Sequence, residues 1–373
     1  MSAPRARLRP ARPPSGSRRL GAALRFLVSE APSGWPRWWL RRGFVAACLL
    51  PAAGLFAAVA ALRRLAWRRG WLRAWRAPVP VVVVGNLSAG GSGKTPVVQW
   101  LAQALRDAGR HPGIVSRGYG RRRDAPEPMA VEPDTPGEDS GDEPLLLRRM
   151  CDCPVWVGAD RPAAARALLR EHPEVDVLLS DDGLQHYALA RDVELVVLDA
   201  RGAGNGWLLP AGPLREPWSR PRDATLGPTP PAGGPAPFFA LRRQPGDLRN
   251  LADGRRMSPG EFRQAHADRP VCAAAAIGNP AQFFDMLRAA GLPLARTVAV
   301  RDHQPLPESL LRELPGVVVV TEKDALKCPL GQAGLDRLWA MGLRLEPDPG
   351  FVPWLLARLA RGAWSSPDGF TSA

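Results

Sequence analysis

The stretch that decides the fold is Pro78–Pro96, which reads PVPVVVVGNLSAGGSGKTP. It begins with a valine-rich run, Val79–Val84, which is typical of a strand buried in a parallel sheet. A glycine-rich turn follows and ends in Gly93-Lys94-Thr95, and apolar residues at helical spacing then continue from Val97 to Leu105. A strand, a glycine-rich loop ending in GKT and a helix are the context of a phosphate-binding loop, so this stretch predicts nucleotide binding.

The phosphate loop offers several groups that hold a triphosphate. Its glycines allow backbone N–H groups to converge on phosphate oxygens, and the start of the helix adds a favourable dipole. Lys94 supplies a cation for the β- and γ-phosphates, and the hydroxyl of Thr95 is placed to bind Mg²⁺. The residues that we expect to bind the nucleotide are Ser88, Ala89, Gly90, Gly91, Ser92, Gly93, Lys94 and Thr95.

A second apolar run, Val175–Leu179, ends in the acidic pair Asp181-Asp182. In nucleotide-binding proteins of this kind, an acidic residue at the end of a neighbouring strand lies on the Mg²⁺ side of the phosphate loop. We therefore predict that Asp181 and Asp182 bind Mg²⁺ together with Thr95.

The rest of the chain alternates short apolar runs, such as Val155–Val157 and Val317–Thr321, with helical stretches such as Arg161–Glu171. This pattern predicts an α/β fold: a P-loop NTPase-type parallel sheet covered by helices, with a second, smaller α/β lobe and the active site in the cleft between them. The expected parts are a disordered extension at 1–34, a membrane-associated helical segment at 35–76, the nucleotide-binding domain at 77–222, a Pro/Gly-rich linker at 223–237, the smaller lobe at 238–345, and a C-terminal helix and tail at 346–373.

The charge of the chain is concentrated in its first 76 residues. The 373 residues carry a net charge of +14, but residues 1–76 contain 16 arginines and one acidic residue, which leaves the remainder near neutral. Arginine is common throughout the chain, whereas Lys94, Lys323 and Lys327 are its only lysines. The basic balance therefore does not predict a nucleic-acid partner. The five cysteines form no CxxC pair, which is consistent with a reducing compartment.

The basic N-terminal part contains an uncharged run, Gly43–Leu62, which is long enough to cross a bilayer. Arginines flank it on both sides, and Trp67, Trp71 and Trp75 recur every four residues, so we expect them to form one stripe of a helix at an anionic membrane surface. Two arrangements remain open, a single span and a helix or hairpin lying in one face of the membrane. Pro51 favours a bent element, whereas a cleaved signal peptide would begin nearer the N-terminus.

Two further motifs place acidic and basic groups beside predicted elements. Gly141-Asp142-Glu143-Pro144 precedes an apolar helix, and Asp142 either accepts a proton from an acceptor hydroxyl or caps that helix. Asp302-His303 follows the predicted strand Arg296–Val300, where a carboxylate and an imidazole can orient or deprotonate a hydroxyl.

Taken together, these motifs resemble the tetraacyldisaccharide 4′-kinases, the lipid A 4′-kinases of Gram-negative bacteria. The matching motifs, in the order of that family, are VGNLSAGGSGKTP, SRGYG, GDEPLLL, DDGLQH, LLPAGPLREP, IGNPAQFF, RDHQPL and TEKDALK. The resemblance implies an enzyme that transfers the γ-phosphoryl of ATP, with Mg²⁺, to the 4′-hydroxyl of an acylated glucosamine disaccharide 1-phosphate. It also implies a position on the cytoplasmic face of the bacterial inner membrane, with no obligate protein partner.

The resemblance also implies roles for individual residues. Asp142 matches the proposed general base, assisted by His303, and Lys94 holds the triphosphate. Asp181 and Asp182 match an acidic Mg²⁺ pair, and Glu216 resembles a further Mg²⁺-linked carboxylate. The residues expected to line the substrate cleft are Arg117, Tyr119, Glu143 and Arg215. The family usually has His or Tyr after its Asp-His pair, where this chain has Gln304.

Two other functions compete with the kinase. The first is a GTPase or ATPase switch of the metallochaperone type, but the chain has neither the NKxD motif nor the Cys/His cluster that would favour it. The second is a non-enzymatic protein that binds membranes or polyanions through its arginine-rich N-terminus. That function predicts that residues 77–373 bind no nucleotide.

Overall fold

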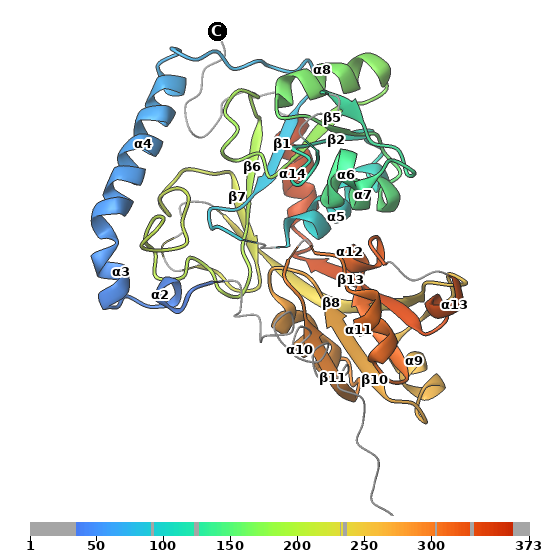
Figure 1. The fold of residues 1–373 in the computed structure, drawn as a ribbon. Helices are drawn as coiled ribbons and strands as arrows, with labels where there is room; N and C mark the ends of the chain where they lie inside the picture. Colours follow the sequence, from blue (N-terminus) through green and yellow to red (C-terminus); the bar gives the residue numbers. More distant parts are fainter. Residues whose placement is uncertain are drawn as a thin grey trace, which may run out of the picture.

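The computed structural model describes residues 35–90, 93–122, 127–231, 233, 237–302, 304–328 and 332–360. Figure 1 shows two lobes, each built from a largely parallel sheet with helices against it, which confirms the predicted mixed α/β fold. The extension 1–34, the tail from 361 onwards, and the site candidates Gly91, Ser92 and His303 lie outside the described residues.

The first lobe is organised around β1 (Val81–Gly85), which lies between β5 (Val177–Asp181) and β6 (Val193–Val197) and is parallel to both. The other strands of this part of the sheet are β2 (Pro112–Ser116), β3 (Met129–Ala130), β4 (Val155–Val157), β7 (Ala224–Gly227) and the first residues of β8 (Phe238–Asn250). Of these described strands, β3 alone pairs antiparallel. Parallel strands place their carboxyl ends at one edge of the sheet, so the loops after β1 and β5 meet there.

Helices cover both faces of the first sheet, which explains why β1 is valine from Val81 to Val84. Val82 and Val84 pack in a core with α5 (Lys94–Asp107), whereas Val81 and Val83 pack in a second core with α8 (Arg161–Glu171). Alternate side chains of a strand point to opposite faces, so a strand buried on both sides needs apolar residues at every position. Two further helices on the α5 side are α6 (Gly137–Ser140) and α7 (Asp142–Met150).

The second lobe repeats this arrangement on a smaller scale. Its strands are β9 (Arg256–Met257), β10 (Val271–Ala275), β11 (Leu294–Ala299), β12 (Val317–Thr321) and β13 (Leu338–Pro347). Its helices are α9 (Pro259–Ala265), α10 (Pro280–Ala289), α11 (Glu308–Glu313), α12 (Glu322–Ala325) and α13 (Gln332–Leu335). β10 lies between β11 and β12 in parallel pairings, with α9 and α10 packed on one face and α11 on the other.

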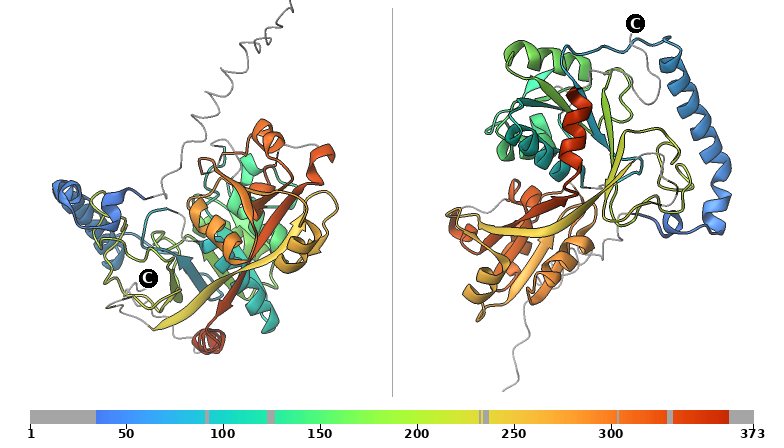
Figure 2. Two further views of the ribbon diagram at one scale, coloured as in Figure 1. Left: turned by 90° about the horizontal axis from the view of Figure 1, so that it is seen from below. Right: turned by 180° about the vertical axis from the view of Figure 1, so that it is seen from behind.

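The long strand β8 joins the two lobes. Its first residues pair in parallel with β7, and residues from Leu241 onwards pair antiparallel with β13 of the second lobe. The strands thus form one continuous path through both lobes, and Figure 2 shows β8 running from one to the other. Part of 223–237, predicted as a linker, is the buried strand β7: residues 224–227 are Ala-Thr-Leu-Gly, and the Pro/Gly-rich composition begins only after them.

The C-terminal helix α14 (Phe351–Ala360) returns to the first lobe. Phe351 and Leu355 belong to the same core as α5, and Phe351 packs against Trp100 with their rings 5.7 Å apart. The chain therefore crosses between the lobes twice, through β8 and again after β13, which holds the two sheets in a defined relation.

The N-terminal helices run along one side of the first lobe (Figure 1). They are α2 (Arg37–Leu40), α3 (Phe44–Cys48) and α4 (Leu50–Arg68). Among the described residues, α4 is the one helix that is long and apolar enough to cross a membrane, and 6% of its most apolar stretch is buried. Pro51 lies in the first turn of α4, where a proline is tolerated. The apolar run therefore forms two helices, α3 and α4, which are separated at Leu49.

The predicted helical stripe of Trp67, Trp71 and Trp75 is wrong. Gly70 adopts a left-handed conformation, with φ at +71°, and ends the helix after Arg68. Trp75 instead lies in extended backbone and forms a bridge with Leu189 of the first lobe. A glycine between the first two tryptophans stops the helix before the four-residue spacing can form a stripe.

Candidate active site

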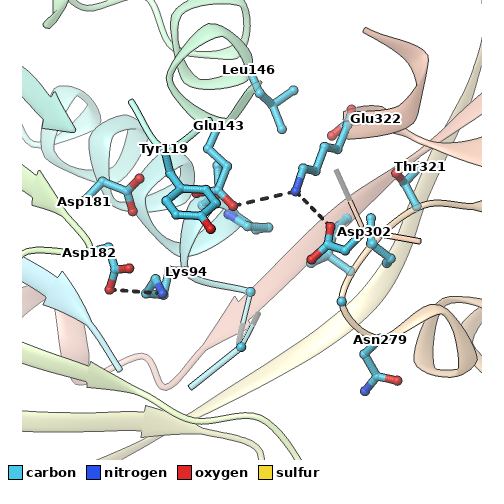
Figure 3. A pocket seen from close by; sticks show the side chains of 18 of the residues that line it. Lys94, Tyr119, Glu143, Leu146, Asp181, Asp182, Asn279, Asp302, Thr321 and Glu322 are labelled. Atoms are coloured by element: carbon cyan, nitrogen blue, oxygen red, sulfur yellow. Dashed lines mark hydrogen bonds and ion pairs between the residues drawn. The ribbon is translucent and has the colours of Figure 1, made fainter. Parts of the chain in front are cut away.

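A cavity of about 840 Å³ lies between the lobes, at the carboxyl ends of the strands of both sheets. The first lobe contributes the loop after β1, the acidic end of β5 and residues from α7. The second lobe contributes the ends of β10 and β12, including Asn279 and Thr321 (Figure 3). Lys323, which follows β12, also lines the cavity. Gly90, Gly93, Lys94 and Thr95 line the cavity, as expected for a phosphate loop.

The phosphate loop is fastened by a residue that the sequence did not single out. Asn86, which is fully buried, donates from Nδ2 to the carbonyl oxygen of Gly90 at 3.2 Å. Its Oδ1 accepts from the Nζ of Lys94 at 3.1 Å. Gly90 and Gly93 have φ of +91° and +70°, which glycine adopts without strain. Asn86 therefore fixes both the loop and the cation that follows it.

Asp181 and Asp182 stand at the end of β5 in different environments. Asp181 is buried, and its Oδ2 accepts from the hydroxyl of Ser116 at 3.2 Å, while no hydrogen-bond partner for Oδ1 is found in the described part of the chain. Burial, together with the charges of Glu143 and Asp182, raises the pKa of Asp181 to about 7. Burial also raises the pKa of Asp182, but Lys94 at 3.1 Å and Arg215 at 3.6 Å outweigh burial and lower it.

These residues fit a magnesium ion. Mg²⁺ binds one or two carboxylates together with water and phosphate oxygens, so it does not require a closed cage of protein ligands. The buried Oδ1 of Asp181 faces a site where Thr95 and Asp182 also line the cavity. A cation bound there would favour the ionised form of Asp181.

The other predicted cleft residues divide into two groups. Arg117, Tyr119, Glu143 and Arg215 all line the cavity. Glu216 does not: it is buried, accepts from the hydroxyl of Tyr187 at 2.7 Å and pairs with the Nε of Arg220 at 2.9 Å. Arg64 of α4 lies 3.7 Å from the same carboxylate. The Mg²⁺ role expected of Glu216 stays a prediction, and its contacts place it in an ion-pair cluster outside the cavity lining.

The two carboxylates at the start of α7 meet two lysines from the second lobe. Lys327 pairs with Asp142. Lys323 lies 3.8 Å from Glu143 and 3.4 Å from Asp302, and dashed lines in Figure 3 mark these two contacts at the labelled carboxylates. Neither lysine was given a role from the sequence. One signal was available, because lysine is rare in this arginine-rich chain. Of its three lysines, Lys94 and Lys323 line the cavity, and Lys327 pairs with Asp142 at the start of α7.

Three other residues at the site were given no role from the sequence. Arg161 is buried beneath Asp181, donating to its carbonyl oxygen at 3.3 Å, and burial lowers its pKa to about 10. His186 lines the cavity, and burial, reinforced by Arg161 and Arg191, lowers its pKa to about 4. Arg243 reaches the phosphate loop from β8.

Comparisons with known proteins show which family the chain resembles. A family model for Tetraacyldisaccharide-1-P 4′-kinase matches residues 45–360. A tetraacyldisaccharide 4′-kinase of Janthinobacterium sp. (strain Marseille) is 46% identical over 331 residues, covering 86% of this chain and 94% of the relative. One from Thiobacillus denitrificans is 47% identical over 331 residues, covering 87% and 98%.

The chain is also similar to a solved structure. The crystal structure of LpxK from Aquifex aeolicus in complex with ATP is similar with a TM-score of 0.70 and 29% identity, covering 85% of this chain and 99% of the other. The chain therefore belongs to the tetraacyldisaccharide-1-P 4′-kinase family, and its activity is that of an ATP-dependent kinase of lipid A biosynthesis.

Proposed function

We propose that the kinase reaction takes place in the cavity between the lobes, with ATP on the first-lobe side. Lys94 and the backbone N–H groups of the loop from Ser88 to Gly93 hold the triphosphate at the N-terminus of α5. The observation that carries this proposal is the ion pair of 3.1 Å between Lys94 and Asp182, which joins the phosphate-binding cation to the metal-binding carboxylates. The presence of ATP in the crystal structure of the Aquifex relative supports it.

Thr95, Asp181 and Asp182 are the residues that would hold Mg²⁺. When bound, the ion neutralises charge on the transferring phosphate and on the ADP that leaves. Asp182 also fixes Lys94 and Arg215, so that both cations face the cavity. The residues on this side of the site thus bind and orient the nucleotide.

The acceptor enters from the side of α7. The 4′-hydroxyl oxygen of the acylated disaccharide 1-phosphate forms a bond to the γ-phosphorus while the bond to the β,γ-bridging oxygen breaks, and ADP leaves. The hydroxyl proton passes to Asp142, which directly precedes the cavity-lining Glu143 and pairs with Lys327. His303 would assist, as the family resemblance implies, and Arg117, Tyr119 and Glu143 line the path of the acceptor.

We further propose that α4 holds the enzyme on the cytoplasmic face of the inner membrane, lying in the surface rather than crossing it. Leu55, Val59 and Leu62 form an exposed apolar stripe along the helix. Both ends of the helical segment are tied to the first lobe: Asn205 donates to the carbonyl of Trp38 at 2.8 Å, and Arg76 pairs with Asp192 at 3.0 Å. A helix of 19 residues is about 28 Å long. A membrane-spanning orientation would draw one of these attached ends away from the lobe.

The reaction is tested by transfer of labelled phosphate from ATP to a detergent-dispersed acylated glucosamine disaccharide 1-phosphate. We expect Lys94→Ala to lower kcat/KM by at least about 10³-fold and Asp142→Ala by about 10²- to 10³-fold. Asp107→Ala, at the exposed end of α5, is the control and should behave like the parent chain. If Asp142→Ala kept full activity, Asp142 would be removed as the base, while loss in Lys94→Ala alone would keep the ATP site.

A further inference from the structure

Arg243 stands on the one strand that belongs to both lobes. It lies on β8 opposite Leu345 of β13, three residues after β8 leaves its pairing with β7 (Figure 1). Its side chain turns back to the first lobe and lines the cavity. The position of this side chain therefore depends on how the second lobe sits relative to the phosphate loop.

The guanidinium group packs directly on the phosphate loop. A Cβ added to Gly93 would lie 2.6 Å from Nη2 and 2.8 Å from Cζ of Arg243, so the guanidinium occupies the space that a side chain at Gly93 would take. Gly93 immediately precedes Lys94, which is directed at the β- and γ-phosphates in loops of this kind. Arg243 therefore stands beside the part of the loop that carries Lys94, in the lining of the same cavity.

The charges around this point favour an anion. Lys94 and Arg215 already share the carboxylate of Asp182, and Arg243 brings a third cation to the same wall of the cavity. The carboxylate of Asp199, which lies near Arg243, accepts a hydrogen bond from the Nε of Arg201 at 2.9 Å. Its negative charge is therefore shared between two arginines. A triphosphate supplies the negative charge that three converging cations require, and guanidinium groups bind phosphate through two parallel hydrogen bonds.

We propose that Arg243 binds the γ-phosphate of ATP beside Lys94. The inference rests on the proposed ATP site and adds a residue to it.

The test compares ATP and ADP binding by calorimetry, with Mg²⁺, in the full chain and its variants. We expect Arg243→Ala to weaken ATP binding about 10- to 100-fold and ADP binding by less than about 3-fold, and Arg243→Lys to recover part of the difference. Arg242→Ala is the matched control, because Arg242 is the adjacent, exposed residue of the same strand. It should bind both nucleotides like the parent chain.

The outcomes separate this inference from the proposed site. Selective loss of ATP affinity in Arg243→Ala supports the inference. Unchanged ATP affinity, or equal loss for ATP and ADP, would overturn it, because a residue that only packs the loop does not distinguish the two nucleotides. If Lys94→Ala also kept its ATP affinity, the proposed location of the ATP site would fall together with the role of Arg243.

Discussion

The two walls of the cleft are built differently. On the first-lobe wall, the charged groups are fixed by partners from the same lobe: Asn86 and Asp182 hold Lys94, and Ser116 holds Asp181. On the second-lobe wall, Lys323 and Lys327 pair across the cleft with the carboxylates of α7. Apart from Arg243 of β8, the first wall is thus arranged for phosphate by residues of its own lobe, whereas the geometry of the acceptor side depends on how the lobes meet.

The largest effect that tests this difference is expected at Asp181. Asp181→Asn should lower kcat/KM by about 10²- to 10³-fold, because a neutral amide cannot hold Mg²⁺ or offset the cations of the first wall. The measurement is activity over a Mg²⁺ titration. Asp176→Asn, in the residue just before the same strand, is the control. Full activity of Asp181→Asn at every Mg²⁺ concentration would contradict a metal role for this wall.

A second test concerns what supports the first wall from outside the cavity. Glu216→Gln should lower the free energy of unfolding by about 3 kcal/mol, because it leaves the buried guanidinium of Arg220 without its full counter-charge. Chemical denaturation measures this change, with the exposed Glu308→Gln as the control. A shift in the Mg²⁺ requirement with unchanged stability would instead favour the metal role that the family resemblance implies for Glu216.

The second wall should give a smaller and more selective effect. Lys323→Ala and Lys327→Ala remove partly exposed ion pairs, so each should lower kcat/KM for the lipid acceptor by about 3- to 10-fold. The KM for ATP should stay within about 2-fold of the parent value. Arg312→Ala, on the exposed face of α11, is the control. An equal change in the KM for ATP would show that the two walls do not act separately.

The same difference explains how much of the site the sequence could predict. The first wall comes from contiguous stretches, so Lys94, Thr95, Asp181 and Asp182 could be assigned from a strand, a loop and the order of their residues. The predicted ranges of β4, α8 and β12 also agree with the structure, since each is bounded by clear changes in hydrophobic pattern.

The contacts that join distant segments could not be predicted in this way. The strands β12 and β8 bring Lys323, Lys327 and Arg243 close to the phosphate loop and α7. No local sequence pattern predicts contacts between segments so far apart in the chain. The predicted tryptophan stripe was wrong for a local reason: a single glycine ends the helix, whatever the spacing of the tryptophans on either side of it. The linker prediction failed at β7, where four residues form a strand because β6 and β8 pair with them on either side.

The smallest expected effect is a pH dependence of stability from the first wall. The pKa of His186 is lowered to about 4, first by burial and then by Arg161 and Arg191, whereas an unfolded histidine titrates near 6.5. Between these values the unfolded chain binds more protons than the folded one, so stability falls as the pH drops from about 6.5 to 4. Because the ring is partly exposed, we expect a loss of about 1–2 kcal/mol.

His186→Gln should remove this part of the pH dependence, while the exposed His172→Gln should keep it. The raised pKa of Asp181 acts in the opposite direction, because the folded chain then binds the extra proton and gains stability as the pH falls below about 7. The difference in unfolding free energy between each variant and the parent chain, measured from pH 4 to 7, separates the two groups. Parallel curves for the parent chain and His186→Gln would mean that His186 takes up its proton in the folded protein, and that this part of the first wall opens to solvent.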